Sequence, residues 1–438
     1  MLHRLLAVAM LAILPTQTFA FCGFYVGKAD SSLFNESSQV ILARDGKRTT
    51  ISMRNDYQGE PTEFALVVPV PVVLKKEDVK VLDAKIFTRL DDYSAPRLVE
   101  YHDEDPCAPK RFEMFAASPP PPPPPAPSAA GGGYVTPLVK VEAFFTVGEY
   151  DIVILSAEES DALETWLTQN GYNIPKGASA ALRPYVRQNM KFFVAKVNLA
   201  AKAKAGGQYL SPLQFAFESE KFMLPMRLGM LNAKGPQDLI VYTLTKKGRV
   251  ESSNYRTAKV PTGIDLPLYV RDQAVFKDFY KTAFGRLAEG DRYRTVFTEY
   301  FWNSSFCDPC VVDPPNSDEI AAAGAGWIVN QYGHRRYDAQ VVVTRLHLRY
   351  TPESFPEDLV LQETADRDFF QARYVLHHPW SGSPYQCDAA MAYFRELDER
   401  EGKQAAALAK LTGWKMADIR DRMPKRTPLP QSPNWRAP

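Results

Sequence analysis

Two cysteines close together, Cys307 and Cys310, make up the part of the sequence with the most reactive chemistry. They follow the aromatic run Tyr300-Phe301-Trp302 and enclose Asp308-Pro309. Two sulfurs at this spacing can form a disulfide, bind a metal ion or exchange disulfides with a substrate. Cys387 is a possible partner farther along the chain.

A redox role for this pair would require a helix that begins at the first sulfur. Backbone N–H groups and the helix dipole lower a thiol pKa there. In this chain Val311-Val312-Asp313-Pro314-Pro315 follows Cys310, and its β-branched residues and prolines delay a helix until about Ser317. Asp308 adds a negative charge, which raises a thiol pKa. We therefore predict a structural disulfide, with a thiol-disulfide oxidoreductase that uses the Cys307/Cys310 pair as the alternative.

Metal and hydrolase chemistry would need further groups. The candidate partners are His334, His347, His377, His378 and Cys387. None of them forms a second pair with zinc-finger spacing, and adjacent histidines on a strand point to opposite faces. Phosphate-loop, zinc-protease and Gly-x-Ser-x-Gly motifs are absent. We predict no metal, no cofactor and no catalytic residue; a hydrolase with a dispersed active site is the second alternative.

The first twenty residues have the pattern of a secretory signal peptide. His3 and Arg4 precede the apolar run Leu5–Leu14, and Pro15 and Ala20 follow it. An apolar run of about ten residues is typical of a signal peptide and is too short to span a membrane, which takes about twenty. We predict cleavage near Ala20, a periplasmic or secreted product and no transmembrane segment in the mature chain.

Disulfides persist in such a compartment. Five cysteines remain after cleavage, and all are disulfide candidates: Cys22, Cys107, Cys307, Cys310 and Cys387. Because five is odd, at least one thiol stays free or pairs with another chain. About fifteen pairings are possible, so the sequence leaves the connectivity open.

The composition is that of a soluble globular protein: 45% apolar and 24% charged residues. Lys and Arg total 52 and Asp and Glu total 51, so no net field favours nucleic acid as a partner. The 35 prolines, 25 Phe and 21 Tyr favour strands and turns.

The hydrophobic pattern predicts an α+β fold, rich in strands, with antiparallel sandwich-like sheets, several helices and a helical C-terminal segment. Strands are expected at 40–43, 49–53, 64–73, 138–145, 150–155, 191–199, 213–219, 221–228, 238–244, 339–350, 358–362 and 369–378. Helices are expected at 158–170, 178–188, 273–287, after Ser317 and at 388–411.

The chain length predicts more than one folded unit. We expect a strand-rich N-terminal domain at 21–260 and an α+β C-terminal domain at 261–423 that contains Cys307 and Cys310. Residues 118–133, with seven consecutive prolines and three glycines, are expected to form a disordered insertion, and 424–438 a disordered tail.

Several motifs together resemble a known bacterial family. They are Phe21-Cys22-Gly23-Phe24, Phe64-Ala65-Leu66-Val67-Val68-Pro69-Val70-Pro71, Gly148-Glu149-Tyr150-Asp151-Ile152-Val153, Cys307-Asp308-Pro309-Cys310, Thr344-Arg345-Leu346-His347-Leu348-Arg349-Tyr350 and Arg373-Tyr374-Val375-Leu376. In this order they resemble the exported proteins grouped as domain of unknown function 2330, across nearly the whole mature chain. The resemblance implies a bacterial source and an envelope location, and it brings no activity.

Together these observations favour an exported envelope protein with a non-enzymatic binding or structural role, stabilised by disulfides. Its partners would be other envelope proteins or cell-wall components.

Thiol titration tests the disulfide interpretation. We expect one thiol to react in the denatured protein without reductant, because five cysteines cannot all pair. Cys307 should not be a low-pKa thiolate. Rapid alkylation of Cys307 at acidic pH would favour the oxidoreductase instead.

Overall fold

The computed structural model describes residues 24–27, 34–58, 64–108, 139–198, 201, 210–232, 235–306 and 314–426. Within these ranges the protein has the α+β fold that the sequence predicts, with mostly antiparallel sheets and helices at its C-terminal end. The expected signal peptide at 1–20 and the insertion at 118–133 lie outside them. No helix in the described ranges is long and apolar enough to cross a lipid bilayer.

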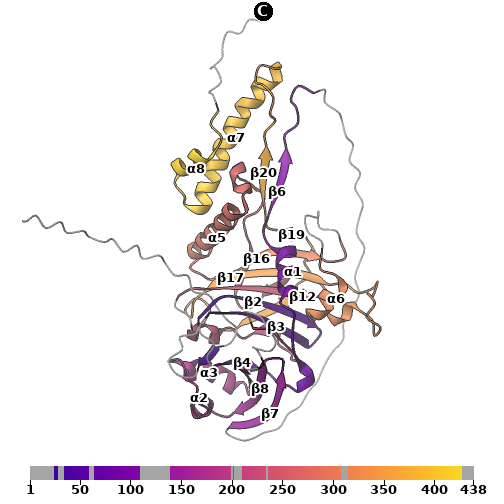
Figure 1. Ribbon diagram of the computed structural model, residues 1–438, viewed down its shortest axis with the longest axis vertical. Coiled ribbons are helices and arrows are strands. Elements are labelled where there is room, and N and C mark those ends of the chain that lie inside the picture. The colour runs from indigo at the N-terminus through magenta and orange to yellow at the C-terminus, as the bar shows by residue number, and fades with distance from the viewer. Residues whose placement is uncertain are drawn as a thin grey trace, which may run out of the picture.

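A nine-stranded sheet forms the middle of the molecule (Figure 1). Its main path runs β14-β16-β17-β12-β2-β3-β10-β5, and β19 pairs with β16. The bounds are β2 Phe34–Asp45, β3 Arg48–Gln58, β5 Val79–Val81, β10 Leu213–Glu218, β12 Gln237–Thr245, β14 Arg256–Lys259, β16 Thr295–Asn303, β17 Val342–Tyr350 and β19 Phe370–Gln371.

A five-stranded sheet packs against one face of this sheet. Its order is β1 (Phe24–Gly27), β4 (Phe64–Val70), β9 (Lys191–Val197), β8 (Tyr150–Ala157) and β7 (Val139–Val147). The shared core includes Val40 and Leu42 of β2 and Phe193 of β9, all at most 1% exposed. Each such side chain contributes about 1.5–3 kcal/mol by leaving water. The predicted sandwich is therefore present.

Helices cover the outer faces of both sheets. Figure 1 shows α2 (Ser160–Gln169) and α3 (Ala178–Arg187) beside the five-stranded sheet, with which they share an apolar core. On the outer face of the nine-stranded sheet lie α1 (Lys85–Ser94), α5 (Gln273–Gly290) and α6 (Ser317–Ala322). Ile41 and Ala43 of β2 point to this side, so β2 is buried on both faces and its run 40–43 is continuously apolar.

The C-terminal part extends away from the sandwich (Figure 1). Strand β20 (Arg373–His378) runs parallel to both β6 (Arg97–His102) and β15 (Ile264–Asp265). Helices α7 (Asp388–Thr412) and α8 (Met416–Arg422) share an apolar core with β20 and α5. The remaining elements are β11 Met223–Leu224, β13 Val250–Ser252, β18 Leu359–Glu363 and the 3-10 helices η1 Lys76–Asp78, η2 Arg227–Asn232, η3 Leu268–Arg271 and η4 Gly326–Ile328.

Most predicted elements are confirmed, and their local signals explain them. Strand β4 ends at Val70, short of the predicted end at 73, because the next residue, Pro71, has no N–H group to donate to the sheet. The turn at Asp45-Gly46 joins β2 to β3 with Gly46 at φ +57°. Gly171 follows α2 with φ +84°, the left-handed conformation expected of a glycine after a helix.

The predicted strand at 221–228 is wrong, because only Met223–Leu224 is extended. Pro225 has no N–H group and a fixed φ, so it stops the strand, and a 3-10 helix follows from Arg227. The predicted strand at 369–378 is two strands. The chain changes partner at Ala372, from β16 to β6.

The nine-stranded sheet contains strands from both sides of residue 260. It thus joins the segments 21–260 and 261–423, which are expected from the sequence to be separate domains.

The start of the expected tail is attached to helix α7: Arg426 Nη1 donates to Glu401 Oε2 of α7 at 2.6 Å. Residues 427–438 lie outside the described ranges.

Two attachments hold α7 beside β6. A disulfide joins Cys107, just after β6, to Cys387 at the start of α7, across 280 residues of chain. Asp103 accepts hydrogen bonds from the Arg400 guanidinium, with Nη1 at 3.1 Å, and from the Tyr393 hydroxyl at 2.6 Å. Cys387 is therefore the partner of Cys107 and not of the Cys307/Cys310 pair.

Replacing both Cys107 and Cys387 by serine should lower the free energy of unfolding by about 2–4 kcal/mol, because the unfolded chain loses a cross-link. Urea unfolding without reductant measures this. Limited proteolysis should then cut near α7 sooner than in the wild type. An unchanged urea midpoint would contradict a stabilising role for this disulfide.

Candidate functional site

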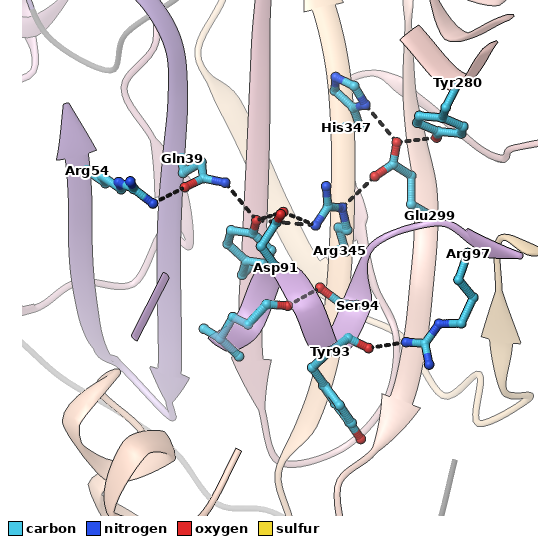
Figure 2. A network of polar contacts seen from close by, with 12 residues as sticks. Gln39, Arg54, Asp91, Tyr93, Ser94, Arg97, Tyr280, Glu299, Arg345 and His347 are labelled. Carbon is cyan, nitrogen blue, oxygen red and sulfur yellow. Dashed lines mark hydrogen bonds and ion pairs between the residues drawn. The ribbon is translucent and has the colours of Figure 1, made fainter. Parts of the chain in front are cut away.

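A buried carboxylate organises the outer face of the nine-stranded sheet. Glu299 lies on β16 where the register against β17 shifts between Thr298 and Tyr300, so it is an extra residue in a bulge. Its side chain is 0% exposed. Glu299 Oε1 is 2.7 Å from His347 Nδ1, Oε2 accepts from Arg345 Nε at 2.5 Å, and the Tyr280 hydroxyl also donates to it (Figure 2).

Arg345 connects Glu299 to helix α1. Its Nη1 donates to Asp91 Oδ1 at 2.5 Å and to the Tyr242 hydroxyl at 3.2 Å. Tyr242 in turn donates to Asp91 Oδ1 at 2.6 Å and receives a hydrogen bond from Gln39 Nε2 at 3.1 Å. Figure 2 shows Arg345 between the two carboxylates. Strand β12 and helix α1 are thereby tied to β17.

His347 extends the network in the other direction. Its ring stacks on Phe284 of α5 with the centroids 3.5 Å apart, and its Nε2 is 3.6 Å from Asp238 Oδ1. Arg349 holds the same Asp238 with two hydrogen bonds, of 2.8 and 2.6 Å. Both ring nitrogens of His347 therefore face carboxylates.

We call Asp91, Asp238, Glu299, Arg345, His347 and Arg349 the charge network. Three of them are acids and two are always-charged guanidinium groups, so a protonated His347 balances the charge. Burial by itself would lower the pKa of His347, but the carboxylates of Glu299 and Asp238 outweigh it and raise that pKa above its ordinary value. The cations also overcome burial at the acids and lower the pKa of Glu299 and of Asp238 to about 2.

The charge network braces the fold. Every charged group in it has an opposite charge as partner. Asp91 fixes helix α1 to the sheet, and the Tyr280 hydroxyl fixes helix α5 to it. Removing one partner of a buried ion pair costs about 3–5 kcal/mol, because the other charge is left unpaired. At His347, Nδ1 is hydrogen-bonded to Glu299, and Nε2 faces Asp238 at 3.6 Å.

The sequence analysis did not identify this network. Arg345, His347 and Arg349 alternate with Leu346, Leu348 and Tyr350, which point into the core between the sheets. This alternation was the available signal for the network. The strand has a charged residue at every second position, and its other positions are apolar. Helix α1 was also missed, although Ile86, Phe87, Leu90 and Tyr93 have helical spacing.

Of the predicted site residues, the structure brings Cys107 and Cys387 together in a disulfide. Cys22, Cys307 and Cys310 lie outside the described residues. His378 is 17% exposed and faces Glu100, His377 lies 3.6 Å from both Asp103 and Asp265, and His334 is on an exposed turn. Among the described residues no Ser or Cys side chain is hydrogen-bonded to these histidines or to His347, and no group of His, Cys, Asp and Glu could hold a metal ion.

An open cavity of about 850 Å³ lies at the end of β12. Its lining comes from the turn after β12, from η4, from the segment before β17 and from the segment after β18. The lining residues are Lys246, Lys247, Trp327, Arg336, Asp338, Ala339, Gln340, Glu363, Thr364, Ala365 and Arg367. Four basic side chains outnumber two acidic ones, so we call it the basic cavity.

Close packing fixes the walls of the basic cavity. A side chain at Gly248 would come within 2.3 Å of the Thr364 carbonyl oxygen, so the turn after β12 lies directly against the segment after β18. Lys246 Nζ lies 5.2 Å from the centre of the Trp327 ring and 2.5 Å from Asp45 Oδ1. Trp327 Nε1 donates to the Gln340 carbonyl at 3.0 Å.

Two cations of the basic cavity are available to a ligand. Lys247 and Arg367 are exposed, and neither makes an ion pair within the described part of the chain. Arg336, by contrast, is held by Asp338 with hydrogen bonds of 3.2 and 2.7 Å. Burial raises the pKa of the Glu363 carboxyl, and the nearby Lys246 and Lys247 partly oppose that rise.

A family model described as an uncharacterized protein conserved in bacteria (DUF2330) matches residues 16–362. No curated protein and no solved structure matches.

The pH dependence of stability tests the charge network. The folded state raises the pKa of His347, so protonated His347 adds to the free energy of unfolding. This contribution is fully present below the pKa of the unfolded chain, about 6.5, and is lost as the pH rises through the pKa of the folded state. Asp238 and Glu299, whose pKa is about 2 in the folded state, add to the free energy of unfolding above about pH 4.5. This contribution is lost as the pH falls toward 2.

We therefore expect His347→Gln to remove part of the fall in the free energy of unfolding that the wild type shows as the pH rises above about 6.5. Urea unfolding at a series of pH values measures it. His334→Gln is the matched control on the exposed turn and should keep the wild-type pH dependence. Equal slopes for the wild type and His347→Gln would contradict protonation of His347 in the folded state.

Proposed function

The chain belongs to the DUF2330 family of bacterial proteins, and on that premise we propose that it is an exported envelope protein that binds an anionic wall component without converting it. The signal-like start of the sequence supports export. The disulfide between Cys107 and Cys387 is compatible with an oxidising compartment.

The position of the charges supports a binding role. The centre of the charge network, at Glu299, Arg345 and His347, is buried, and its charged groups pair with one another, so the network holds α1 and α5 on the sheet. The basic cavity, by contrast, presents exposed charges to solvent. Its volume of about 850 Å³ is within the usual range of ligand pockets, about 300–1,000 Å³.

One observation carries the proposal: Lys247 and Arg367 line an open cavity at exposed positions, and neither forms an ion pair among the described residues. A guanidinium and an ammonium in this state form charge-assisted hydrogen bonds with carboxylate or phosphate groups. The walls around them are fixed by the contact between Gly248 and Thr364 and by the hydrogen bond of Trp327, so little ordering is needed on binding.

Co-sedimentation with purified bacterial cell wall tests this function. We expect the wild type to sediment with the wall at low salt and to be released as salt is raised, because salt screens exposed charges. The double variant Lys247→Ala/Arg367→Ala should bind at least about tenfold more weakly, since hydrogen bonds to charged groups contribute about 1.5–3 kcal/mol each.

The control is Lys277→Ala/Arg420→Ala, which removes the same charges from exposed positions of α5 and α8. It should bind like the wild type. Equal binding by both double variants would show that the basic cavity is not the site, and a wild type that stays in the supernatant would contradict the proposed function.

A further inference from the structure

A rigid turn carries two exposed tyrosines beside the basic cavity. The chain folds back after η4, where Val329 and Arg335 form a bridge and Arg336 N donates to the Ile328 carbonyl at 2.8 Å. Asn330 Oδ1 accepts from two backbone N–H groups inside the turn, at 2.9 and 3.0 Å. These bonds fix the turn without help from any partner molecule.

The two rings on this turn are open to solvent. Tyr332 is 75% exposed and stands next to Gly333, which has φ +79° at the tip. Tyr337 is fully exposed, and its neighbours Arg336 and Asp338 both line the basic cavity. The tyrosine surface, defined here as Tyr332 and Tyr337, therefore lies on the segment that leads from the turn into the cavity wall at Arg336 and Asp338.

Tyrosine is a common contact residue at recognition sites, because its ring is large and flat and loses little conformational entropy. A ring of this kind can pack against the C–H face of a sugar. The Arg336–Asp338 pair adds donors and acceptors at the cavity edge, and Gln340 and Thr364 add neutral polar groups. The hydroxyl groups of a sugar can both donate and accept hydrogen bonds, so they suit such a lining.

The lining also argues against an acidic peptide. Apart from Trp327, its apolar members are Ala339 and Ala365, which are too small to form a pocket for an anchoring side chain. Peptides are bound through such pockets or through an exposed strand edge. The cations Lys247 and Arg367 favour a ligand that carries negative charge.

Resting on the proposed function, we propose that the basic cavity and the tyrosine surface together bind a polysaccharide that carries carboxylate groups. Part of the sugar chain occupies the cavity, where its carboxylates meet Lys247 and Arg367. The chain then continues across Tyr337 and Tyr332. Long chains bind more tightly than short ones, because only long chains reach both parts of the site.

Calorimetric titration with defined ligands tests this inference. The probes are oligogalacturonates of two and of about ten units, neutral maltoheptaose and poly-glutamate. We expect the ten-unit acid to bind best, the two-unit acid at least about tenfold more weakly, and maltoheptaose and poly-glutamate weaker still.

Matched variants separate the two parts of the site. Tyr332→Ala/Tyr337→Ala should weaken binding of the ten-unit acid about tenfold and leave the two-unit acid unchanged. Lys247→Ala/Arg367→Ala should weaken both acids. Tyr385→Ala, which removes a 68% exposed ring just before α7, is the control and should bind both like the wild type. Thermal melts check that each variant is folded.

The results distinguish this inference from the proposed function. If the tyrosine variant binds the ten-unit acid as the wild type does, the polysaccharide path over the turn is wrong and the cavity remains the binding site. If poly-glutamate binds more tightly than the ten-unit acid, the ligand is an acidic peptide and not a polysaccharide. If no anionic probe binds and the wild type does not sediment with cell wall, both proposals fail.

Discussion

Burial of the Glu299 carboxylate is the constraint on which the outer layer of this fold depends. A charge with 0% exposure is tolerated only when it is paired and fully hydrogen-bonded. Arg345, His347 and Tyr280 meet that requirement, and they do so from β17 and α5. Since Arg345 also binds Asp91 of α1, satisfying one carboxylate fixes two helices on the same sheet.

The same face is therefore part apolar and part ionic. An apolar core under α1 and α6 lies on one side of the charge network, and a second apolar core under α5 lies on the other. Ion pairs add less stability than an equal apolar volume would, but they accept only one arrangement of partners. We infer that the charge network fixes where the helices sit, and that the apolar cores supply most of the stabilisation.

The basic cavity lies where this scaffold ends. Its walls are connections: the turn after β12, the segment before β17 and the segment after β18. Loops held by a rigid scaffold are the usual location of binding residues. Two of the strands that carry these connections, β12 and β17, are braced by the charge network, so the position of Lys247 depends indirectly on Glu299. Strand β18, which precedes Arg367, belongs to a separate three-stranded sheet. The C-terminal helices are attached separately, through Asp103 and the Cys107–Cys387 disulfide.

The sequence by itself determined the class of fold and most elements, because strands and helices follow from local periodicity, glycine turns and proline breaks. Residues 40–43 and the glycine after α2 are examples. Only the tertiary structure decided which residues meet. Asp91 and Arg345 are 254 positions apart, and Cys107 and Cys387 are 280 apart. Such contacts depend on strand order, on one bulge at Glu299 and on the sheet shared across residue 260, and no local pattern encodes these.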